Sequence, residues 1–500
     1  MIPVSGFEGR RVAVFGLGRS GITAARALKA GGAQPILWDD SVSSRMQAEA
    51  EGFAVEDLTV ADWSSFAALV LSPGAPLTHP KPHWTVGKAK AAGVEVIGDI
   101  ELFARAIAAL PDGERPRVIA ITGTNGKSTT TALIGWVLKQ AGLTVHVGGN
   151  IGIGVLALPA PTPGAVYVVE VSSYQLDLTT RFAPDVAILT NITPDHLDRH
   201  GGMDGYVAAK ARIFKAHGAG KTALVGTDDQ WIKPIAYGLP RTGWTTTVTT
   251  RVLVVGGGKR GGTPVDQVGR RGAAWEQAFH DGHFISMEAC DGELTADGLF
   301  LADLTKARSL PGNHNAQNAA FAYAAARALG VPHERTVTGL LSFPGLAHRM
   351  EPVGRLGRVR FVNDSKATNA DAARQALSSY DRVFWIAGGR AKAGGIDDLA
   401  DLFPRVTEAF LIGEAAGPFA AALQAASGGD TPHRISGDMA AAVRDAAQAA
   451  AQAAAATGRD QVVLLSPAAA SFDQYPDFEA RGEAFRAAVL ALGAEPETAA

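Results

Sequence analysis

The stretch Val118-Ile-Ala-Ile-Thr-Gly123-Thr-Asn-Gly126-Lys127-Ser128-Thr129-Thr130 is the most informative part of this chain. Its apolar, β-branched start predicts a buried strand, its glycines predict a turn, and Lys127 opens a predicted helix that reaches about Gly142. When a strand, a glycine turn and a helix follow one another in this way, the N–H groups of the turn and the helix N-terminus face an anion. The lysine adds a positive charge, and Ser128 supplies a hydroxyl for Mg²⁺. The general nucleotide-binding motif, G-x-x-x-x-G-K, requires a glycine at position 121, where this chain has Ile121. The stretch therefore predicts a nucleotide-binding loop of a shorter, more restricted form.

The bulk composition limits the classes of function. Five hundred residues favour about three domains. A net charge of −3 offers no electrostatic argument for nucleic acid or an anionic membrane as a partner. The single cysteine, Cys290, excludes a disulfide framework and a thiolate metal cluster. We find no secretory signal and no run of roughly 18 to 20 apolar residues, so we expect a cytoplasmic protein without membrane insertion.

Strand-like and helix-like runs alternate along most of the chain. This alternation predicts α/β layers with largely parallel sheets. A polar stretch over 111–116 reads as a linker before the phosphate loop, and a third segment begins near Pro344. From about Pro240 to Leu301 the chain is rich in Gly and Thr and predicts a β-rich excursion to which we assign no chemistry.

A second glycine turn, Gly16-x-Gly18-x-x-Gly21, follows the predicted strand at 11–15. With Asp39 about 20 residues on, it has the pattern of a nicotinamide-dinucleotide fingerprint. The same spacing suits a tight turn that needs glycines only for packing. The phosphate loop offers a third interpretation, in which the turn holds the diphosphate of a nucleotide-linked substrate and Asp39 lies near its base or ribose.

Polar side chains also end two predicted strands of the second segment. Glu170 ends one apolar run, at the edge where ligands of parallel sheets bind and where an unpaired carboxylate is costly to bury. Asp195 and His196 follow the next strand in the same manner. Each fits a solvated strand end as well as a site, but beside the phosphate loop they form a plausible Mg²⁺ cluster. Lys210, on a predicted helix over 206–214, reads on this argument as an ordinary solvated charge.

Later polar motifs are candidates by position. Asn315 and Asn318 lie three residues apart on one helix face, although Asn315 also suits a helix cap. The run at 363–369, Asn-Asp-Ser-Lys-Ala-Thr-Asn, directly follows a predicted strand, which indicates either a site or a turn that caps the next helix. A polar-aromatic strand end and helix start occupy 466–482.

These motifs together resemble the muramyl amino-acid ligases over nearly the whole chain. The motifs that carry the resemblance are Gly-Leu-Gly-Arg-Ser-Gly (16–21), Ser-Pro-Gly (72–74), Gly-Asp-Ile-Glu-Leu (98–102), Gly-Thr-Asn-Gly-Lys-Ser-Thr (123–129), Gly-Asn-Ile-Gly (149–152), Glu-Val-Ser-Ser-Tyr-Gln-Leu (170–176), Asp-His-Leu-Asp-Arg (195–199), Asn-Asp-Ser-Lys-Ala-Thr-Asn (363–369) and Ser-Pro-Ala-Ala-Ala-Ser-Phe-Asp-Gln-Tyr (466–475). The phosphate loop is shared with folylpolyglutamate synthetases, whereas the motifs at 363–369 and 466–482 point to the member that adds D-glutamate.

The resemblance implies an α/β fold of three domains. These are a Rossmann-like, UDP-substrate-binding domain over 1–112, a central P-loop ATPase-type domain with a mostly parallel sheet over 113–344, and a Rossmann-like, amino-acid-binding domain over 345–500. The implied activity is ATP- and Mg²⁺-dependent ligation of D-glutamate to UDP-N-acetylmuramoyl-L-alanine through an acyl phosphate, in cytoplasmic peptidoglycan precursor synthesis. We expect a monomer whose partners are these small molecules. The alternatives are a sister ligase, a folylpolyglutamate-type ligase, and a nucleotide-binding module without ligation.

The resemblance also implies roles for individual residues around ATP. Lys127 would contact the β- and γ-phosphates, Ser128 and Glu170 would hold one Mg²⁺, and His196 and Lys210 would serve a second metal. In the family this lysine is carbamylated, which requires a neutral amine and therefore a depressed pKa. The full set expected to contact ATP is Gly123, Thr124, Asn125, Gly126, Lys127, Ser128, Thr129, Asn315, Asn318, Arg349 and Asp364.

Two further sets are implied for the other substrates. The residues expected on the uridine-diphosphate side are Ser20, Asp39, Ser72, Gly74 and Asn150. The residues expected to receive D-glutamate are Thr368, Lys392, Ser471, Phe472 and Phe478, with Lys392 opposite a carboxylate.

Overall fold

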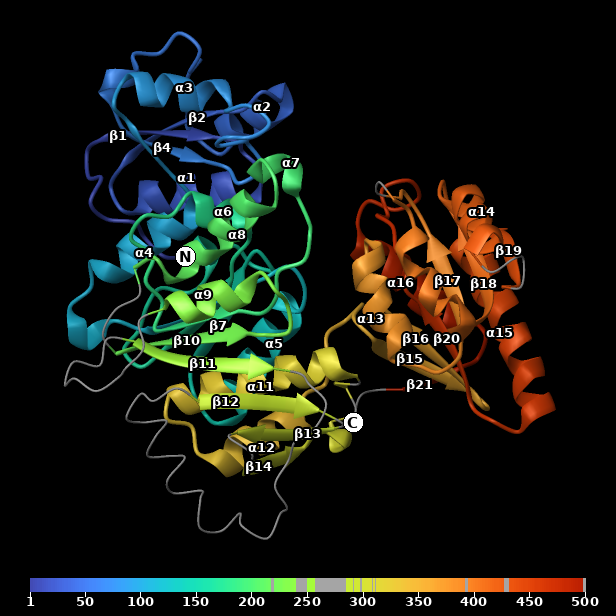
Figure 1. Ribbon diagram of the computed structural model, residues 1–500. Coiled ribbons are helices and arrows are strands. Elements are labelled where there is room, and N and C mark those ends of the chain that lie inside the picture. The colour runs from blue at the N-terminus through green and yellow to red at the C-terminus, as the bar shows by residue number, and fades with distance from the viewer. Residues whose placement is uncertain are drawn as a thin grey trace. The chain divides into compact units, whose positions relative to one another are not determined.

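The computed structural model describes residues 1–216, 220–239, 250–256, 285–290, 292–296, 299–307, 309–310, 312–391, 394–426 and 431–497. In these ranges the strands form three sheets, and the chain divides into two compact units. The first unit comprises Met1–Asp303 with Ala316–Leu340, and the second comprises Leu304–Asn315 with Leu341–Ala500. Each sheet is mostly parallel and is accompanied by helices, so the predicted α/β class is confirmed (Figure 1).

The first sheet has the strand order β3-β2-β1-β4-β5, with all neighbours parallel. Its strands are β1 (Arg11–Phe15), β2 (Gln34–Trp38), β3 (Ala54–Val55), β4 (Phe66–Leu71) and β5 (Glu95–Ile97). Its helices are α1 (Arg19–Ala30), α2 (Val42–Ala50), α3 (Trp84–Ala91) and α4 (Asp99–Ala108). This order reverses between β1 and β4, which is the switch point where ligands of open parallel sheets bind. The turn Gly16–Gly21 lies there because it directly follows β1.

Helices cover both faces of this sheet. Ala24 and Leu28 of α1 share one core with Phe103 of α4, while Val86 of α3 packs on the other face with Trp63. The first of these cores continues into the second sheet, where the rings of Phe103 and Tyr167 lie 5.5 Å apart. The first two sheets therefore belong to one compact unit.

The second sheet has the order β14-β13-β12-β11-β10-β9-β6-β8-β7. Its strands are β6 (Arg117–Thr122), β7 (Val145–Gly149), β8 (Val166–Glu170), β9 (Val186–Leu189), β10 (Lys221–Gly226), β11 (Thr250–Gly256), β12 (Ile285–Cys290), β13 (Glu293–Ala296) and β14 (Leu299–Asp303). Its neighbours are parallel from β7 to β12, and β13 and β14 add antiparallel pairings. The predicted β-rich region at 240–301 thus contributes β11 to β14, and its other residues lie mostly outside the described ranges.

The helices of this region are mostly short. They are α5 (Lys127–Gln140), α6 (Ser173–Asp177), α7 (Leu197–His200), α8 (Met203–Ala211), α9 (Ile232–Gly238), α11 (Asn313–Ala328) and α12 (His333–Leu341). The helix predicted over 206–214 is α8 followed by a 3₁₀ turn, Arg212–Phe214, so the regular helix starts and ends earlier than expected. Nowhere in the described ranges is a helix both long enough and apolar enough to cross a bilayer.

The third sheet, in the second unit, has the order β19-β18-β17-β20-β16-β15-β21. Its strands are β15 (Glu351–Leu356), β16 (Val359–Asn363), β17 (Val383–Gly388), β18 (Val406–Ile412), β19 (His433–Gly437), β20 (Gln461–Leu465) and β21 (Glu495–Pro496). Its helices are α13 (Ala370–Ser378), α14 (Ala416–Ala426), α15 (Met439–Thr457) and α16 (Phe478–Ala491). Two separate cores flank it, one with α13 and α14 and the other with α15 and α16, as in a doubly wound fold.

Candidate functional site

The phosphate loop joins the central strand β6 to the helix α5. Gly126 precedes α5 with a φ of +80°, a left-handed conformation that favours glycine. A Cβ at this position would lie 2.6 Å from Oδ1 of Asn318, and a Cβ at Gly123 would lie 1.9 Å from Oγ1 of Thr190. Both glycines are therefore needed for close approach, and the strand, turn and helix predicted from the sequence are confirmed here.

The end of the neighbouring strand β9 shapes this loop. The backbone N–H of Thr124 donates to the carbonyl of Asn191 at 2.8 Å, and the N–H of Asn125 donates to Oδ1 of Asn191 at 2.8 Å. Oγ1 of Thr190 donates to the carbonyl of Asn125 at 2.7 Å. These bonds hold the loop in its shape before any ligand binds, which reduces the ordering cost of binding.

Two lysines meet at one carbonyl of the loop. Nζ of Lys127 and Nζ of Lys210 donate to the carbonyl of Gly123 at 2.9 and 2.7 Å. Lys210 is only 2% exposed, so reading it from its helix alone as a solvated charge is wrong. Burial, together with the positive charge of Lys127, holds the pKa of Lys210 well below its usual range. A lysine in such surroundings is readily neutral and nucleophilic.

Glu170 lies at the carboxyl end of β8, beside β6. It is 2% exposed, and its Oε1 accepts from Nδ2 of Asn150 at 2.9 Å. Its Oε2 is buried without a hydrogen-bond partner. An unsatisfied buried carboxylate oxygen is costly unless a cation or a donor reaches it, so this donor set fits a hard divalent cation.

The described residues contain no group of three or more His, Cys, Asp or Glu side chains arranged to hold a metal. A Mg²⁺ ion at Glu170 would therefore complete its shell with hydroxyl, phosphate or water oxygens. Mg²⁺ is commonly bound in this way, through one or two carboxylates and a substrate phosphate.

A pocket of about 200 Å³ opens at the carboxyl ends of these strands. It brings together six of the residues that the sequence singled out, which are Gly74, Lys127, Asn150, Asp195, His196 and Lys210. Its other lining residues are Pro73, Ser172, Ser173, Tyr174 and Tyr206. The pocket therefore joins the turn after β4 of the first sheet to the phosphate loop of the second.

His196 stands at the start of α7 in a left-handed conformation, with a φ of +53°. Its Nε2 lies 3.4 Å from Oδ2 of Asp195, and its ring lies 5.1 Å from that of Tyr174. A non-glycine residue with positive φ is uncommon and clusters at functional sites, so this backbone supports the choice of His196.

Sequence reasoning missed Tyr206 as a member of this pocket. Its hydroxyl lies 3.0 Å from Oγ1 of Thr124, and Nζ of Lys210 lies 4.7 Å from the centre of its ring. The available signal was the spacing of four residues between Tyr206 and Lys210, which places both side chains on one face of α8.

Three of the predicted uridine-side residues, Ser20, Asp39 and Ser72, lie at the first glycine turn or beside it. Oδ2 of Asp39 accepts from the N–H of Leu17 at 2.6 Å, and Ser72 donates its N–H to the carbonyl of Phe15 at 2.9 Å. The hydroxyl of Ser20 hydrogen-bonds the buried carboxyl of Asp99. These three residues lie outside the 200 Å³ pocket.

Asn315 and Asn318 are buried on the helix α11. Oδ1 of Asn318 accepts from Oγ1 of Thr130, in α5, at 3.0 Å. Asn318 therefore packs directly against the helix that the phosphate loop opens.

The predicted residues of the second unit surround the carboxyl ends of β16 and β20. Burial raises the pKa of Asp364 to about 7, although its carboxyl accepts from Oγ of Ser466 at 3.0 Å and the charge of Arg349 opposes the shift. Ser471 is buried, whereas Phe472 is exposed and Thr368 is half-buried. Phe478 begins α16, and Nζ of Lys366 lies 3.7 Å from the centre of its ring. Lys392 lies outside the described residues.

Arg481 is a buried residue of this unit to which the sequence assigned no role. The residue is 1% exposed, and its guanidinium donates to the carbonyls of Ser365 and Ala469 at 2.8 and 3.0 Å and to Oγ of Ser365 at 3.0 Å. Burial lowers its pKa to about 10. Arg481 thus ties the loop after β16 to the loop after β20, and its only sequence signal was its place within the motif at 466–482.

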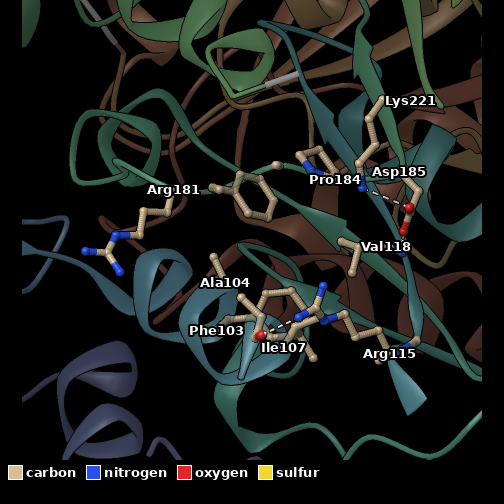
Figure 2. A pocket seen from close by; sticks show the side chains of 13 residues that line it. Phe103, Ala104, Ile107, Arg115, Val118, Arg181, Pro184, Asp185 and Lys221 are labelled. Atoms are coloured by element: carbon tan, nitrogen blue, oxygen red, sulfur yellow. Dashed lines mark hydrogen bonds and ion pairs between the residues drawn. The ribbon is translucent and has the colours of Figure 1, made fainter. Parts of the chain in front are cut away.

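A second pocket, of about 230 Å³, lies at the opposite ends of the strands of the second sheet (Figure 2). Val118 and Lys221 at the starts of β6 and β10 line it, together with Phe103 of α4. Two of its cations are engaged by the fold, because Nζ of Lys221 lies 2.9 Å from Oδ1 of Asp185 and Arg115 donates to the carbonyl of Ala108 at 2.7 Å. No predicted site residue lies in this second pocket.

Comparison with protein families gives two matches along the chain. Residues 121–251 match the model of the Mur ligase middle domain, and residues 348–469 match that of the Mur ligase glutamate ligase domain. The UDP-N-acetylmuramoylalanine–D-glutamate ligase of Caulobacter sp. (strain K31) is 60% identical over 494 residues, which cover 99% of this chain and 98% of that protein. The protein of the same name from Agrobacterium fabrum is 52% identical and covers 98% of this chain and 97% of its own length.

Solved structures give the same fold at low sequence identity. The UDP-N-acetylmuramate-alanine ligase of Thermotoga maritima matches with a TM-score of 0.54 at 15% identity and covers 97% of this chain and 99% of its own. A MurF structure from Acinetobacter baumannii matches with a TM-score of 0.52 at 18% identity, covering 94% and 89% of the two chains.

Proposed function

The chain belongs to the Mur ligase family, and we propose from this premise that it joins D-glutamate to UDP-N-acetylmuramoyl-L-alanine in an ATP-driven reaction. The relatives at 52% to 60% identity, which carry the name of that ligase and align over almost the whole chain, support the choice of amino acid. The observation that carries the chemistry is the meeting of Lys127 and Lys210 at Gly123, within the electrostatic reach of Glu170, whose Oε2 is unsatisfied. The chain is an ATP-dependent, amide-bond-forming ligase.

The first step activates a carboxylate, which is a poor electrophile. A carboxylate oxygen of the alanyl group attacks the γ-phosphorus of ATP, the bond from that phosphorus to the bridging oxygen breaks, and ADP leaves. We assign Lys127 to the β- and γ-phosphates, because its ammonium already lies on the loop that would hold them. Positioning and charge stabilisation supply most of the catalysis in such transfers.

We assign Ser128 and Glu170 to one Mg²⁺ and His196 and Lys210 to a second. When bound, these ions neutralise charge on the phosphate oxygens. The orphaned Oε2 of Glu170 supports the first assignment. The presence of His196 and Lys210 in the pocket that Lys127 also lines supports the second.

Lys210 would act as a carbamate. Its neutral amine nitrogen attacks CO₂, a C–N bond forms, and one proton leaves, so that an ammonium is replaced by an anionic oxygen ligand. The burial of Lys210 and the charge of Lys127 favour the neutral amine that this reaction needs.

In the second step the amine of D-glutamate attacks the carbonyl carbon of the acyl phosphate. A tetrahedral intermediate collapses, the C–O bond to phosphate breaks, and amide and inorganic phosphate form with loss of a proton from the amine. We assign D-glutamate to the domain at 345–500, with Thr368, Lys392, Ser471, Phe472 and Phe478 as its contacts. We assign Arg349 and Asp364 to the phosphate and ribose of the nucleotide, and Asn315 and Asn318 to adenine.

The UDP group of the acceptor would occupy the domain at 1–112. We assign Ser20, Asp39, Ser72 and Gly74 to it, together with Asn150 of the domain at 113–344. The strand order with its switch point beside the turn Gly16–Gly21 supports this choice, because a diphosphate binds at such turns. We place the reaction in the cytoplasm and propose that the enzyme acts as a monomer.

An assay of phosphate release tests the activity. With ATP, Mg²⁺ and UDP-N-acetylmuramoyl-L-alanine, D-glutamate should support turnover well above L-alanine, and above meso-diaminopimelate paired with its longer acceptor. Equal turnover with those amino acids would favour a sister ligase. If no amino acid stimulated phosphate release and reduced nicotinamide bound tightly, the chain would instead be a nucleotide-binding module.

A further inference from the structure

A buried serine, histidine and aspartate form a chain of contacts at the wall of the 200 Å³ pocket. Nε2 of His200 lies 3.0 Å from Oγ of Ser173, and Nδ1 of His200 lies 3.3 Å from Oδ2 of Asp177. Ser173 and Asp177 are the two ends of the short helix α6, and His200 ends α7. Ser173 also lines the pocket, whereas His200 and Asp177 do not.

Aromatic rings hold the histidine in this arrangement. The ring of Tyr174 stacks on His200 at 5.5 Å and 21°, and the ring of Tyr206 lies at 5.4 Å and 50°. The side chain of His200 is 2% exposed. The imidazole therefore has little room to rotate, and both of its nitrogens keep their partners.

The carboxylate favours one tautomer of His200. Oδ2 of Asp177 lies 3.3 Å from Nδ1, so an ionised Asp177 favours the neutral tautomer that carries its ring proton on Nδ1. Nε2 is then an acceptor, and the hydroxyl of Ser173 must donate to it. Because its one proton is used in this way, Oγ of Ser173 can offer only lone pairs to a ligand in the pocket.

The reacting carboxylate of the acceptor must reach this pocket. Lys127, which we assign to the γ-phosphate that this carboxylate attacks, lines the pocket together with Ser173. In UDP-N-acetylmuramoyl-L-alanine the donor nearest to the reacting carboxylate is the alanyl amide N–H, one carbon away. An acceptor atom in the wall of the same pocket fits this group.

We propose that Oγ of Ser173 accepts the alanyl amide N–H of the acceptor substrate, and that His200 and Asp177 are positioning residues that set the direction of this bond. The proposal rests on the proposed function and deepens it. It makes the enzyme selective for an amide over an ester at the alanyl position, because an ester oxygen would face the lone pairs of Ser173.

The test compares two acceptors in steady-state kinetics. One is UDP-N-acetylmuramoyl-L-alanine, and the other carries L-lactate in place of L-alanine, so that an ester oxygen replaces the N–H. For the wild-type protein we expect kcat/KM to be at least about tenfold higher for the amide, as for the loss of one buried hydrogen bond. A wild-type amide-to-ester ratio near one overturns the proposal.

Variants then assign the selectivity to named residues. Ser173→Ala should bring the amide-to-ester ratio of kcat/KM close to one, chiefly through a higher KM for the amide. His200→Phe should also lower this ratio, because the hydroxyl of Ser173 then has no fixed partner and can rotate. Thr179→Val is the matched control, since it removes a buried hydroxyl that bonds only the carbonyl of Leu176 outside the pocket. It should keep the wild-type ratio.

The outcomes are distinct. An unchanged ratio in Ser173→Ala overturns the role of the serine, and an unchanged ratio in His200→Phe overturns that of the histidine. If Ser173→Ala does not fold, His200→Phe and the wild-type ratio still decide. Absence of D-glutamate-dependent phosphate release by the wild type with the amide acceptor would instead overturn the proposed function, before the ester is tested.

Discussion

The two glycine loops that follow β1 and β6 have the same backbone plan and opposite electrostatic partners. In the first, Gly16 has a φ of +86° and a Cβ at Gly21 would lie 1.9 Å from the carbonyl oxygen of Gly16. In the second, Gly126 has a φ of +80° and its Cβ would meet Asn318. Both loops connect a central parallel strand to a helix.

Their charged partners differ. The first loop donates the N–H of Leu17 to the carboxylate of Asp39, whereas the second offers the carbonyl of Gly123 to the amines of Lys127 and Lys210. Glycine spacing therefore reports only the shape of a phosphate-sized turn. The side chains brought from other strands and helices decide whether a triphosphate undergoing transfer or a passive diphosphate suits the loop.

The largest expected effect comes from removing the charge of the second loop. Lys127→Ala should lower kcat/KM for phosphate release by about 10² to 10³, the usual cost of losing a group that stabilises transition-state charge. Lys139→Ala, an exposed lysine in the last turn of the same helix, should change it little. If Lys127→Ala lowered kcat/KM by less than threefold, the lysine of the second loop would not stabilise the transferred phosphate. The proposed difference in function between the two loops would then be wrong.

Lys210 should produce the next largest effect and a dependence on CO₂. Lys210→Ala should lower turnover by about tenfold to a hundredfold, and added short carboxylates should restore part of it by replacing the carbamate oxygens. Protonation of the amine prevents carbamylation, so activity should fall with falling pH. Because burial depresses the pKa of Lys210, that loss should occur at a lower pH than for an ordinary lysine.

Turnover measured in CO₂-free and bicarbonate-supplemented buffers across this pH range checks the second prediction. Bicarbonate should restore activity in the wild type and leave Lys210→Ala unchanged. Equal activity in both buffers, with no rescue of the variant by carboxylates, would remove the carbamate from the mechanism.

The backbone of the second loop should tolerate change less than a glycine of the same φ elsewhere. Gly126→Ala should raise KM for ATP by about tenfold, because its Cβ displaces Asn318 and the left-handed backbone is strained. Gly142→Ala is the matched control, since Gly142 has a φ of +89° but no atom within 4 Å of the added Cβ. It should lower the free energy of unfolding without changing KM for ATP.

The smallest effect is expected at the first loop. Asp39→Asn should raise KM for the UDP-linked acceptor by at most about tenfold and leave KM for ATP unchanged, because one charged hydrogen-bond acceptor is replaced by a neutral one. The two KM values, measured separately, test whether the first loop binds the acceptor and the second binds ATP. If Asp39→Asn changed only the KM for ATP, this assignment of the two loops would be wrong.

The sequence predicted what depends on neighbouring residues. The strand, turn and helix around Gly123 and Gly126 were correct because β-branched runs, glycine turns and helix starts are encoded within a few residues. The environment of Lys210 could not be predicted from its helix, because its burial depends on a carbonyl 87 residues away in the chain. Resemblance to the family implied a role for Lys210, and the fold gave the physical reason for its depressed pKa.

Other features also required the tertiary structure. The free oxygen of Glu170 and the contact between His200 and Ser173 depend on which strand ends and helices pack together. His200 gave no signal in the sequence, since a histidine at the end of a four-residue helix has no periodic neighbour to mark it as buried.

By itself, the sequence determined the α/β class, the phosphate loop and the motifs that identify the ligase family, because each is written in local spacing and residue type. Only the tertiary structure decided the protonation tendency of Lys210, the unsatisfied oxygen of Glu170 and the contact between His200 and Ser173. These properties depend on burial and on distances between segments far apart in the chain, and both arise only when the sheets and helices have packed.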